Sequence, residues 1–560
     1  MASILDQYGG GKQTGGIINL RSDQMEPIFM KNKIDFRPNY PITNMVVSNN
    51  QLLLSMENFH LLKIDLMNPN KPIELDLNPY LVSIKSPNRP VILGIFIDPT
   101  GQHCLITVGQ RLKHDLPFND NPIIPFENFY YYRKLSQLNK MKGHIITAVG
   151  WIDQQQPTGQ CGNLLIGTNE GKLYETHLQS DDRFLQSREL SFWKFICDLS
   201  PQSSTTNHQN PDSLSSSSAS NSYDPNKSTT AAANISSSNH QIPTTTIKHE
   251  PICSIRIFRL KNTFDLEYCI LIATRNFIYQ YIGRLTSSIQ VAGGSGNSGG
   301  GGQTSNIDFV AVNNNPAGQS TIIDGQPYLY QIIQSTTINN QKTFKEMPGY
   351  IPVTKLDLYQ PSLSSSSIST NQDQSNRNSN YPLSFGWLTE PGIFYGEIPE
   401  NLAYNNNERK IFDNAQVILY SDLNPSMSSS KTSKDTSSAA TNRHRSIPKS
   451  LILTRFHLML LYSQKLQVYC LLNRELIWED RFIGGEIVED LIKDPQRNTI
   501  WLYTKNSVYR YRIDREDRNI WEIYLQRKDF DLAKRYARND LIKMDRIVCE
   551  EALYNFANKK

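Results

Sequence analysis

The sequence predicts a mainly β fold, a divergent, WD40-like β-propeller of seven blades, followed by the first helices of an α-solenoid. Three observations predict this fold. Short runs of alternating apolar and polar residues occur in pairs around turn residues, which is the pattern of β-hairpins. Such hairpins recur along most of the 560-residue chain. After residue 515 the apolar spacing changes to that of amphipathic helices.

The hairpin pattern has five clear examples, in which an apolar run meets a short polar turn and a second alternating run follows. In the last of them, Tyr509 and Tyr511 fall on one face of a strand and Arg510 and Arg512 on the other. We find no regular helices between the hairpins, which excludes a parallel βαβ sheet and leaves sandwiches, barrels and propellers. The examples are QLLLSMENFHLLKIDL at 51–66, NLLIGTNEGKLYETHL at 163–178, CILIATRNFIYQYIG at 269–283, FHLMLLYSQKLQVYCLL at 456–472 and TIWLYTKNSVYRYRI at 499–513.

Length favours the propeller over a sandwich or barrel, because single sandwiches and barrels are usually much smaller. We expect residues 1–28 to be a flexible tail and residues 29–515 to form the propeller. Polar, low-complexity tracts that bury too little apolar surface to fold are expected as insertions between its strands. Without them, seven blades average about 53 residues, somewhat above the roughly 40–50 of known propeller repeats. The tracts are 200–249, 289–306, 361–380 and 421–448.

The C-terminal residues 516–560 have helical spacing and are predicted to be the truncated start of an α-solenoid. Trp521, Tyr524 and Leu525 fall at i, i+3, i+4, and Phe530 begins a second apolar series that includes Tyr536. We expect these five side chains to form the apolar seam of the first helical hairpin. A third segment offers Ile542, Ile547, Ala552 and Phe556 for one side. The alternative is a capping helix hairpin packed on the propeller.

No residue pattern supports catalysis or metal binding. GGGKQTGG at 9–16 has Gln13 where a phosphate-binding loop needs Ser or Thr after the lysine. His144 and His103 lack partners at ligand or catalytic spacing, so both are expected to be structural. The acidic pairs Glu479–Asp480 and Glu489–Asp490 are expected at solvated turns between strands. We therefore expect neither an enzyme nor a cofactor-binding protein.

Charge and cysteine usage exclude further classes. The net charge of +4 arises from 57 basic and 53 acidic side chains that are intermixed, whereas a nucleic-acid binder concentrates basic charge on one face. FENFYYYRKL at 126–135 offers an aromatic and basic surface for nucleic acid, but a blade strand or protein interface explains it better. The seven cysteines are scattered and never form CxxC, which fits reduced, mostly buried thiols.

The sequence contains neither a secretory signal at its start nor an apolar window long enough to span a bilayer. We therefore expect a cytoplasmic protein. Lipidation motifs and basic amphipathic helices are also not evident. Membrane attachment would then be peripheral and made through partner proteins.

Several strings, in the same order along the chain, resemble the vacuolar protein sorting-associated protein 18 family, also called the deep orange family. The resemblance covers most of the chain outside the low-complexity tracts. It is closest over 491–538, LIKDPQRNTIWLYTKNSVYRYRIDREDRNIWEIYLQRKDFDLAKRYAR, at the predicted change from propeller to solenoid. The other strings are PIFMKNKIDFRPNYPITNMVVSNNQLLLSMENFHLLKIDL at 27–66, AVGWID at 148–153, LLIGTNEGKLYETHL at 164–178, SFGWLTEPGIFYGEI at 384–398 and ILTRFHLMLLYSQKLQVYCLL at 452–472.

The resemblance implies an N-terminal β-propeller, a long α-solenoid and a C-terminal zinc-binding RING domain. Members of this family are core subunits of the HOPS and CORVET (class C) tethering complexes. These complexes act with Rab GTPases and SNAREs where endosomal membranes meet lysosomes or vacuoles. The present sequence has no counterpart of the RING, so a zinc site is not carried over. The chain is then expected to be a fragment or a short product.

Together, the residues and the resemblance predict a non-enzymatic scaffold subunit of a HOPS/CORVET-type complex. It would act in vesicle docking and fusion and in protein sorting, peripherally on late endosomes, lysosomes or vacuoles. Its partners would be other class C subunits, Rab GTPases and SNAREs, without nucleic acid. Two alternatives stay open: a propeller–solenoid scaffold of a coat or nucleoporin-like assembly, and a propeller enzyme with histidines and carboxylates in its central channel.

Overall fold

The computed structural model describes most of the predicted propeller and the C-terminal helices. The predicted insertions at 200–249 and 289–306 lie outside the described residues. So do residues 1–26 of the predicted tail, 362–380 and 424–446. The described residues are 27–81, 90–111, 123–131, 135–152, 160–179, 193–199, 250–260, 266–285, 328–338, 343–361, 381–400, 402, 411–423, 447–482, 486–537 and 540–558.

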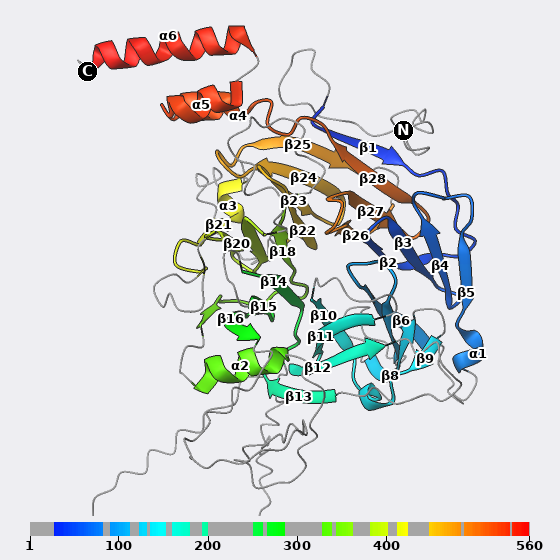
Figure 1. Ribbon diagram of the computed structural model, residues 1–560. Coiled ribbons are helices and arrows are strands. Elements are labelled where there is room, and N and C mark those ends of the chain that lie inside the picture. Colours follow the sequence, from blue (N-terminus) through cyan, green and yellow to red (C-terminus); the bar gives the residue numbers. More distant parts are fainter. Residues whose placement is uncertain are drawn as a thin grey trace, which may run out of the picture.

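The described strands form seven four-stranded antiparallel sheets arranged as a ring, which confirms a mainly β, propeller-type fold (Figure 1). We number the sheets, or blades, in chain order. Blade 1 is β2 (Ile42–Ser48), β3 (Gln51–Met56), β4 (His60–Asp65) and β5 (Ile73–Asp76); blade 2 is β6 (Pro90–Ile97), β7 (Cys104–Arg111), β8 (Ile123–Tyr131) and β9 (Leu135–Gln137); blade 3 is β10 (Ile146–Trp151), β11 (Gln160–Thr168), β12 (Lys172–Gln179) and β13 (Trp193–Asp198).

In the remaining blades each strand also pairs with the next along the chain, except that the outer strand of blade 7 is β1. Blade 4 is β14 (Ser254–Arg259), β15 (Leu266–Ala273), β16 (Phe277–Leu285) and β17 (Thr343–Glu346); blade 5 is β18 (Leu356–Tyr359), β19 (Ser384–Leu388), β20 (Gly392–Glu397) and β21 (Gln416–Leu419); blade 6 is β22 (Ser450–Leu453), β23 (His457–Leu461), β24 (Lys465–Cys470) and β25 (Leu476–Arg481); blade 7 is β26 (Val488–Lys493), β27 (Ile500–Thr504), β28 (Val508–Ile513) and β1 (Phe29–Lys33).

The two ends of the β region close the ring. The N-terminal strand β1 is the outer strand of blade 7 and pairs antiparallel with β28, from Phe29 opposite Ile513 to Lys33 opposite Tyr509. The innermost strands contact one another in the order β2, β6, β10, β14, β18, β22, β26 and back to β2. Because one blade contains both ends of the β region, opening the ring would require breaking a complete strand pair.

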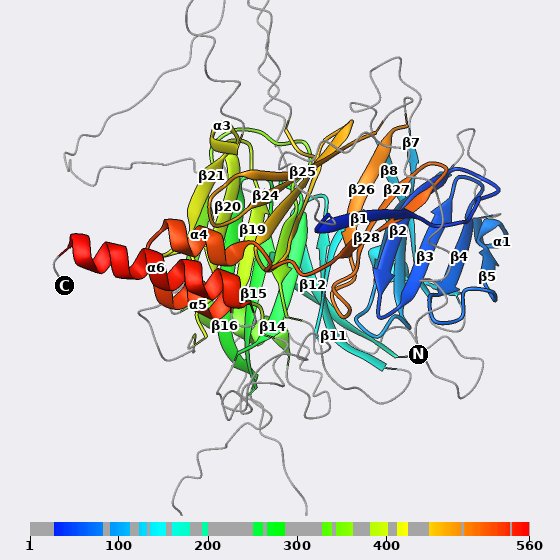
Figure 2. The same cartoon turned by 90° about the horizontal axis from the view of Figure 1, so that it is seen from above.

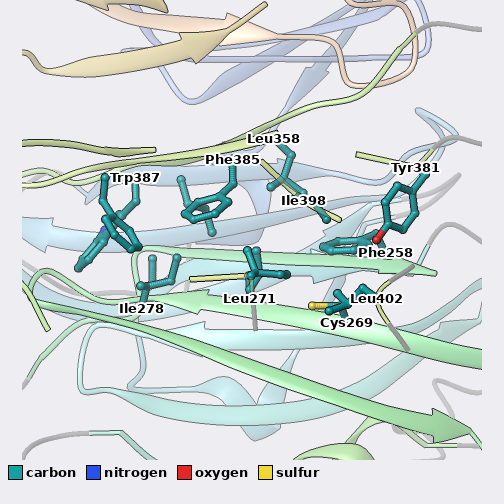
Figure 3. Close-up of a cluster of buried hydrophobic side chains, with 14 of the residues drawn as sticks. Phe258, Cys269, Leu271, Ile278, Leu358, Tyr381, Phe385, Trp387, Ile398 and Leu402 are labelled. Atoms are coloured by element: carbon teal, nitrogen blue, oxygen red, sulfur yellow. The ribbon is translucent and has the colours of Figure 1, made fainter. Parts of the chain in front are cut away.

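The core of the ring lies between neighbouring blades, where the apolar faces of two sheets meet. Between blades 4 and 5, Phe258, Cys269 and Leu271 from one sheet pack against Phe385 and Trp387 from the other (Figure 3). Comparable clusters lie between other neighbouring blades. Apolar side chains on both faces of a sheet are therefore buried, because a neighbouring blade covers each face.

A buried carboxylate joins the last blade to the first. Asp494, directly after β26, accepts hydrogen bonds from the backbone N–H groups of Asn49 and Asn50 in the β2–β3 turn, at 3.1 and 3.2 Å. Both asparagines have positive φ, 47° and 62°, a conformation that Asn tolerates better than most residues. The tight turn thus points two N–H groups at one carboxylate across the closure of the ring.

The expectation of no regular helices within the β region is wrong. A ten-residue helix, α2 (Leu329–Ile338), lies between β16 and β17, and short turns of helix occur at α1 (Asn78–Leu81), η2 (Asn139–Met141) and α3 (Tyr420–Leu423). Leu329, Ile332 and Ile333 of α2 join the core of blades 3 and 4. The i, i+3, i+4 spacing of these three residues is typical of a helix and could have predicted it. The long Gly- and Asn-rich stretch before them is typical of a linker and so concealed this pattern.

The N-terminus of α2 is held by Glu175, a buried residue of β12. One carboxylate oxygen accepts from the N–H of Leu329 and the other from the N–H of Tyr330, both at 2.7 Å. Asn163 donates a further hydrogen bond at 3.1 Å. Burial raises the pKa of Glu175 to about 7, although these hydrogen bonds and Lys194 oppose the rise. A strand carboxylate thus caps a helix distant in sequence.

One predicted insertion begins too early. Tyr420 and Leu423 of α3 are buried in the core between blades 5 and 6, so 421–423 belong to the folded body rather than to the tract 421–448. The composition of the tract is polar, but its first residues directly follow β21. The apolar Leu423 was the only residue there that indicated packing.

Three helices follow the ring: α4 (Ile520–Gln526), α5 (Phe530–Ala537) and α6 (Leu541–Ala557). They leave blade 7 from β28 and lie beside blade 6, with α6 farthest from the ring (Figures 1 and 2). No helix in the described ranges has the length and apolarity needed to cross a bilayer.

Candidate functional site at the propeller–helix junction

The five predicted seam residues lie together at the junction of ring and helices. Trp521, Leu525 and Phe530 are buried in one apolar cluster with Ala533, Ala537 and Ile547, and Tyr524 and Tyr536 pack against it partly buried. The rings of Tyr524 and Tyr536 are stacked, with centroids 5.6 Å apart and planes at 10°. Helical spacing on α4 and α5 therefore brings these side chains into one seam between the helices.

A second cluster, which the sequence reasoning missed, attaches the seam to blade 6. Ile520 and Ile523 on the other side of α4 are buried against Phe456 and Cys470 of the propeller. Tyr524 and Tyr536 also border this cluster. Ile520 and Ile523 gave a signal for it, because they make α4 apolar on a second side, but the partners of that side belong to blade 6, far earlier in the chain.

Glu516, in the linker between β28 and α4, is the polar anchor of the junction. Its Oε1 atom accepts hydrogen bonds from the hydroxyl of Thr454, from the N–H of Phe456 at 2.8 Å and from Nδ1 of His457 at 2.9 Å. Burial disfavours the carboxylate, but the contacts with His457 and Thr454 outweigh it and lower the pKa of Glu516. An ionised Glu516 thus fixes the linker on the β22–β23 turn.

Contacts at the rim complete the joint. Arg455 lies over the ring of Phe456 at 4.9 Å and near that of Tyr536 at 5.8 Å. Arg527, at the end of α4, donates to the backbone oxygen of Leu472. Since the second cluster, the polar anchor and the Arg527 contact all involve the β22–β25 sheet, the direction in which the helices leave the ring is set by blade 6.

The far side of α6 differs from the expected pattern. Ile547 is buried as predicted, but Ile542 is 82% exposed, Phe556 is 86% exposed and Ala552 is exposed as well. The inner side of α6 contacts α5 through the ring of Tyr554 on that of Phe530 and through Glu551, which pairs with Lys534 at 2.6 Å. The outer face of α6 is nevertheless largely apolar: it carries Leu541, Ile542, Val548, Cys549, Ala552, Leu553 and Phe556, with Asp545 among them.

The acidic pairs expected at solvated turns lie within strands. Glu479 and Asp480 are buried residues of β25, where Gln467 donates to Glu479 at 2.6 Å and Lys31 pairs with Asp480 at 2.9 Å. Tyr511 also donates to Asp480 at 2.9 Å. Glu479 can be buried because the neighbouring strand supplies a donor, and Asp480 because strands distant in sequence do. Glu489 and Asp490 belong to β26.

Two lysines brace the innermost strands of blades 5, 6 and 7. Lys355, before β18, donates to Ser450 at 2.8 Å and pairs with Asp490 at 3.2 Å. Lys493 at the end of β26 donates to Asp357 at 3.3 Å and to the backbone oxygens of Leu358 and Leu453. Burial lowers the pKa of Lys493, although Asp357 opposes this. The axis of the propeller thus carries lysine–aspartate pairs.

The histidines named from the sequence have structural neighbours. His103 is buried and its Nδ1 lies 3.0 Å from Asp98 in the β6–β7 turn, and His144 lies 3.6 Å from Glu170. Phe129, from the aromatic stretch 126–135, is buried in β8, as expected of a blade strand. Within the described part of the chain, no three His, Cys, Asp or Glu side chains gather as metal ligands do.

Comparisons with known proteins identify the relatives of this chain. Residues 27–513 match the Pep3/Vps18/deep orange beta-propeller domain. The vacuolar protein sorting-associated protein 18 homolog of Danio rerio is 24% identical over 581 aligned residues, covering 100% of this chain and 45% of that protein. The homolog of Drosophila melanogaster is 30% identical over 32% of this chain and 17% of that protein.

Vacuolar sorting protein 18 of Arabidopsis thaliana is 20% identical over 83% of this chain and 34% of its own length. The chain thus spans less than half the length of these curated relatives. The matched residues run from the start of β1 to the end of β28, which is the whole closed ring. This chain therefore belongs to the Pep3/Vps18/deep orange family.

Proposed function

We propose that this chain is a non-enzymatic scaffold subunit of a class C tethering complex of the HOPS or CORVET type. It would act in vesicle docking and fusion between endosomes and lysosomes or vacuoles, and so in vacuolar protein sorting. Membership of the Pep3/Vps18/deep orange family and the names of the curated relatives support this role. A closed propeller offers broad surfaces for protein contacts and so suits a subunit whose task is to position other proteins.

One structural observation supports the scaffold role most directly: helix α6 has two apolar faces, and only one is covered. The inner face packs on α5 through Ile547 and Tyr554. The outer face carries Leu541, Ile542, Leu553 and Phe556, all more than half exposed. A helix within an α-solenoid contacts a neighbour on each side, so this arrangement is typical of a repeat onto which another stacks.

The α4–α6 segment would therefore be the first repeat of an α-solenoid. Glu516, together with Ile520 and Ile523 packed on Phe456 and Cys470, would dock it on blade 6. The joint would transmit the orientation of the ring to the helices. In an assembled complex the ring would remain free to contact Rab GTPases, SNAREs or other class C subunits. Attachment to late endosomal, lysosomal or vacuolar membranes would be peripheral and made through these partners.

Affinity purification of the protein, expressed from its own gene with a tag, tests the tethering role. We expect class C subunits, Rab GTPases and SNAREs among the proteins that co-purify. Recovery of coat or nucleoporin components instead would overturn the tethering role and favour the alternative scaffold.

Hydrogen exchange on residues 516–537 and 540–558 tests the solenoid role separately. In the isolated chain we expect fast exchange in α6 because one face is uncovered, and strong protection after assembly with the co-purified subunits. Equal and strong protection in both states would instead identify α4–α6 as a self-contained cap on the propeller.

A further inference from the structure

Helix α2 is an addition to blade 4 that the sheet itself does not require. It lies between β16 and β17, the two outermost strands, which pair with each other although 57 residues, 286–342, separate them. In blades 1 and 6 the corresponding strands pair across connections of only seven and five residues, 66–72 and 471–475. Two adjacent antiparallel strands therefore need no helix between them. What holds α2 in place must be its contacts with blades 3 and 4 (Figure 1).

The side of blade 4 that α2 covers has space for one of its side chains. Tyr281 and Gly283 lie on the same face of β16, and Tyr281 shares an apolar cluster with Leu329 and Ile332 of α2. A Cβ atom at Gly283 would lie 2.7 Å from Cγ2 of Ile332, closer than non-bonded carbon atoms approach. Ile332 thus occupies the place that a side chain at Gly283 would need.

Blade 3 supplies a polar contact for the same helix. Glu175 is fully buried, and its two oxygens accept the N–H groups of Leu329 and Tyr330. Burying a carboxylate is costly unless it is hydrogen-bonded, and a helix N-terminus offers both free N–H groups and positive partial charge. Glu175, Tyr281 and Gly283, which we call the α2 site, therefore combine a cap for a helix N-terminus with an apolar surface.

The contacts at the α2 site require only a general helical pattern. Leu329, Ile332 and Ile333 follow the i, i+3, i+4 spacing of one apolar face, while Gln331 and Gln334 are exposed. The cap uses backbone N–H groups, which do not depend on the side chains that follow. An amphipathic helix of different sequence but the same apolar spacing would therefore make the same contacts.

The apolar surface continues beyond α2. Phe277 and Tyr279 alternate along the same face of β16 as Tyr281 and Gly283. Phe344 of β17 lies opposite Tyr279, its ring is 6.1 Å from those of Phe277 and Tyr279, and it is 52% exposed. Because a helix of the same chain has the advantage of a high effective concentration, a helix of another protein displaces it only by making additional contacts. Phe344 offers such a contact.

We propose that the α2 site is a receptor for an amphipathic helix of a partner protein, and that α2 fills it in the absence of that helix. The partner helix carries the apolar spacing of α2 and a free N-terminus, and it covers Phe344 in addition. Its binding releases α2 from blades 3 and 4. This interaction goes beyond the tethering role and does not depend on it.

The first test measures whether α2 opens by itself. Hydrogen exchange is followed on the unaltered chain, and we expect the amides of α2 to exchange about tenfold or more faster than those of β15 and β16. Equal exchange rates in the helix and the strands would show that α2 is a permanent part of the core and would overturn the proposal.

The second test supplies the helix as a separate molecule. A fluorescent peptide with the sequence of residues 328–338 is titrated into the unaltered chain and into a chain in which Gly and Ser replace that segment. We expect binding to the replaced chain to be about tenfold or more tighter, because α2 occupies the site in the unaltered chain. Leu329→Asp in the full chain weakens the docking of α2 and is the receptor to use if the replaced chain fails to fold.

Two altered peptides are the matched controls. Ile332→Asp in the peptide should abolish binding, because Ile332 packs at Gly283, whereas Gln334→Asp should not, because Gln334 is exposed. Equal binding of both altered peptides, or no binding of the unaltered one, would contradict the proposal. Dimers of the unaltered chain that dissociate on adding peptide would also contradict it, since they would assign the site to α2 of a second copy.

Discussion

The closed ring and the helical segment use apolar surface differently. In the ring, each sheet face meets a neighbouring blade, and the pairing of β1 with β28 leaves no open end. In the helical segment, α4 is covered on two sides, whereas α6 is covered on one. The comparison teaches that the ring covers its own apolar faces, while the helical segment leaves one apolar face of α6 exposed.

The largest expected effect tests the closed ring. Trp387 is fully buried between blades 4 and 5 (Figure 3), so Trp387→Ala should lower the free energy of unfolding by about 3–5 kcal/mol. Phe556→Ala on the exposed face of α6 is the matched change in the helical segment and should alter this free energy by no more than about 0.5 kcal/mol. Urea unfolding followed by circular dichroism measures both. Similar losses in the two variants would contradict the comparison.

The next effect separates the seam from the ring. Phe530 is 9% exposed and packs on Tyr554, so Phe530→Ala should cost about 3 kcal/mol, at the low end of the range for a buried ring. The loss should appear as faster hydrogen exchange in α5 and α6, with the protection of β14–β20 unchanged. Loss of protection throughout the propeller would show that the seam and the ring unfold as one unit.

A smaller effect concerns the polar joint and its pH dependence. Glu516→Gln removes a carboxylate that binds His457 and two other donors, and should cost roughly 2 kcal/mol near neutral pH. Because the pKa of Glu516 is lowered in the folded chain, its contribution is present above the unfolded value of 4.5. It is lost as the pH falls through the folded pKa.

Acid unfolding between pH 3 and 6 measures this contribution. The stability of the unaltered chain should fall more steeply with acid than that of the Glu516→Gln variant. Identical acid profiles would exclude Glu516 as the titrating anchor of the joint.

The smallest effect concerns Glu175, whose contribution to stability falls as the pH rises, opposite to that of Glu516. The pKa of Glu175 is raised to about 7 in the folded chain, so folding takes up a proton between its unfolded and folded pKa values. Stability should therefore fall as the pH rises, by about 1 kcal/mol between pH 6 and 8. Glu175→Gln should remove this slope. Melting temperatures over that range measure it, and a slope that persists in the variant would assign it to another group.

Glu175 and Glu516 show why local sequence does not set a pKa. Both accept backbone N–H groups, but Glu516 also meets the His457 ring at 2.9 Å, whereas Glu175 meets Asn163 and the start of α2. Burial therefore prevails at Glu175, and the partners prevail at Glu516. The side-chain partners of each glutamate come from another segment of the chain. Asn163 donates to Glu175, and Thr454 and His457, which lie close together, bind Glu516.

The amino-acid sequence by itself determined the β-hairpins, the polar tracts and the change to helices after β28, because alternation and helical spacing are local properties. It also placed Trp521, Tyr524 and Leu525 on one helix and Phe530 and Tyr536 on the next, at spacings that put each set on one side of its helix. Only the tertiary structure decided the rest. Closure by β1, the burial of Asp480, the cap of α2 and the anchoring by Glu516 all join residues far apart in sequence. Such contacts depend on the order of blades around the ring, which no local pattern contains.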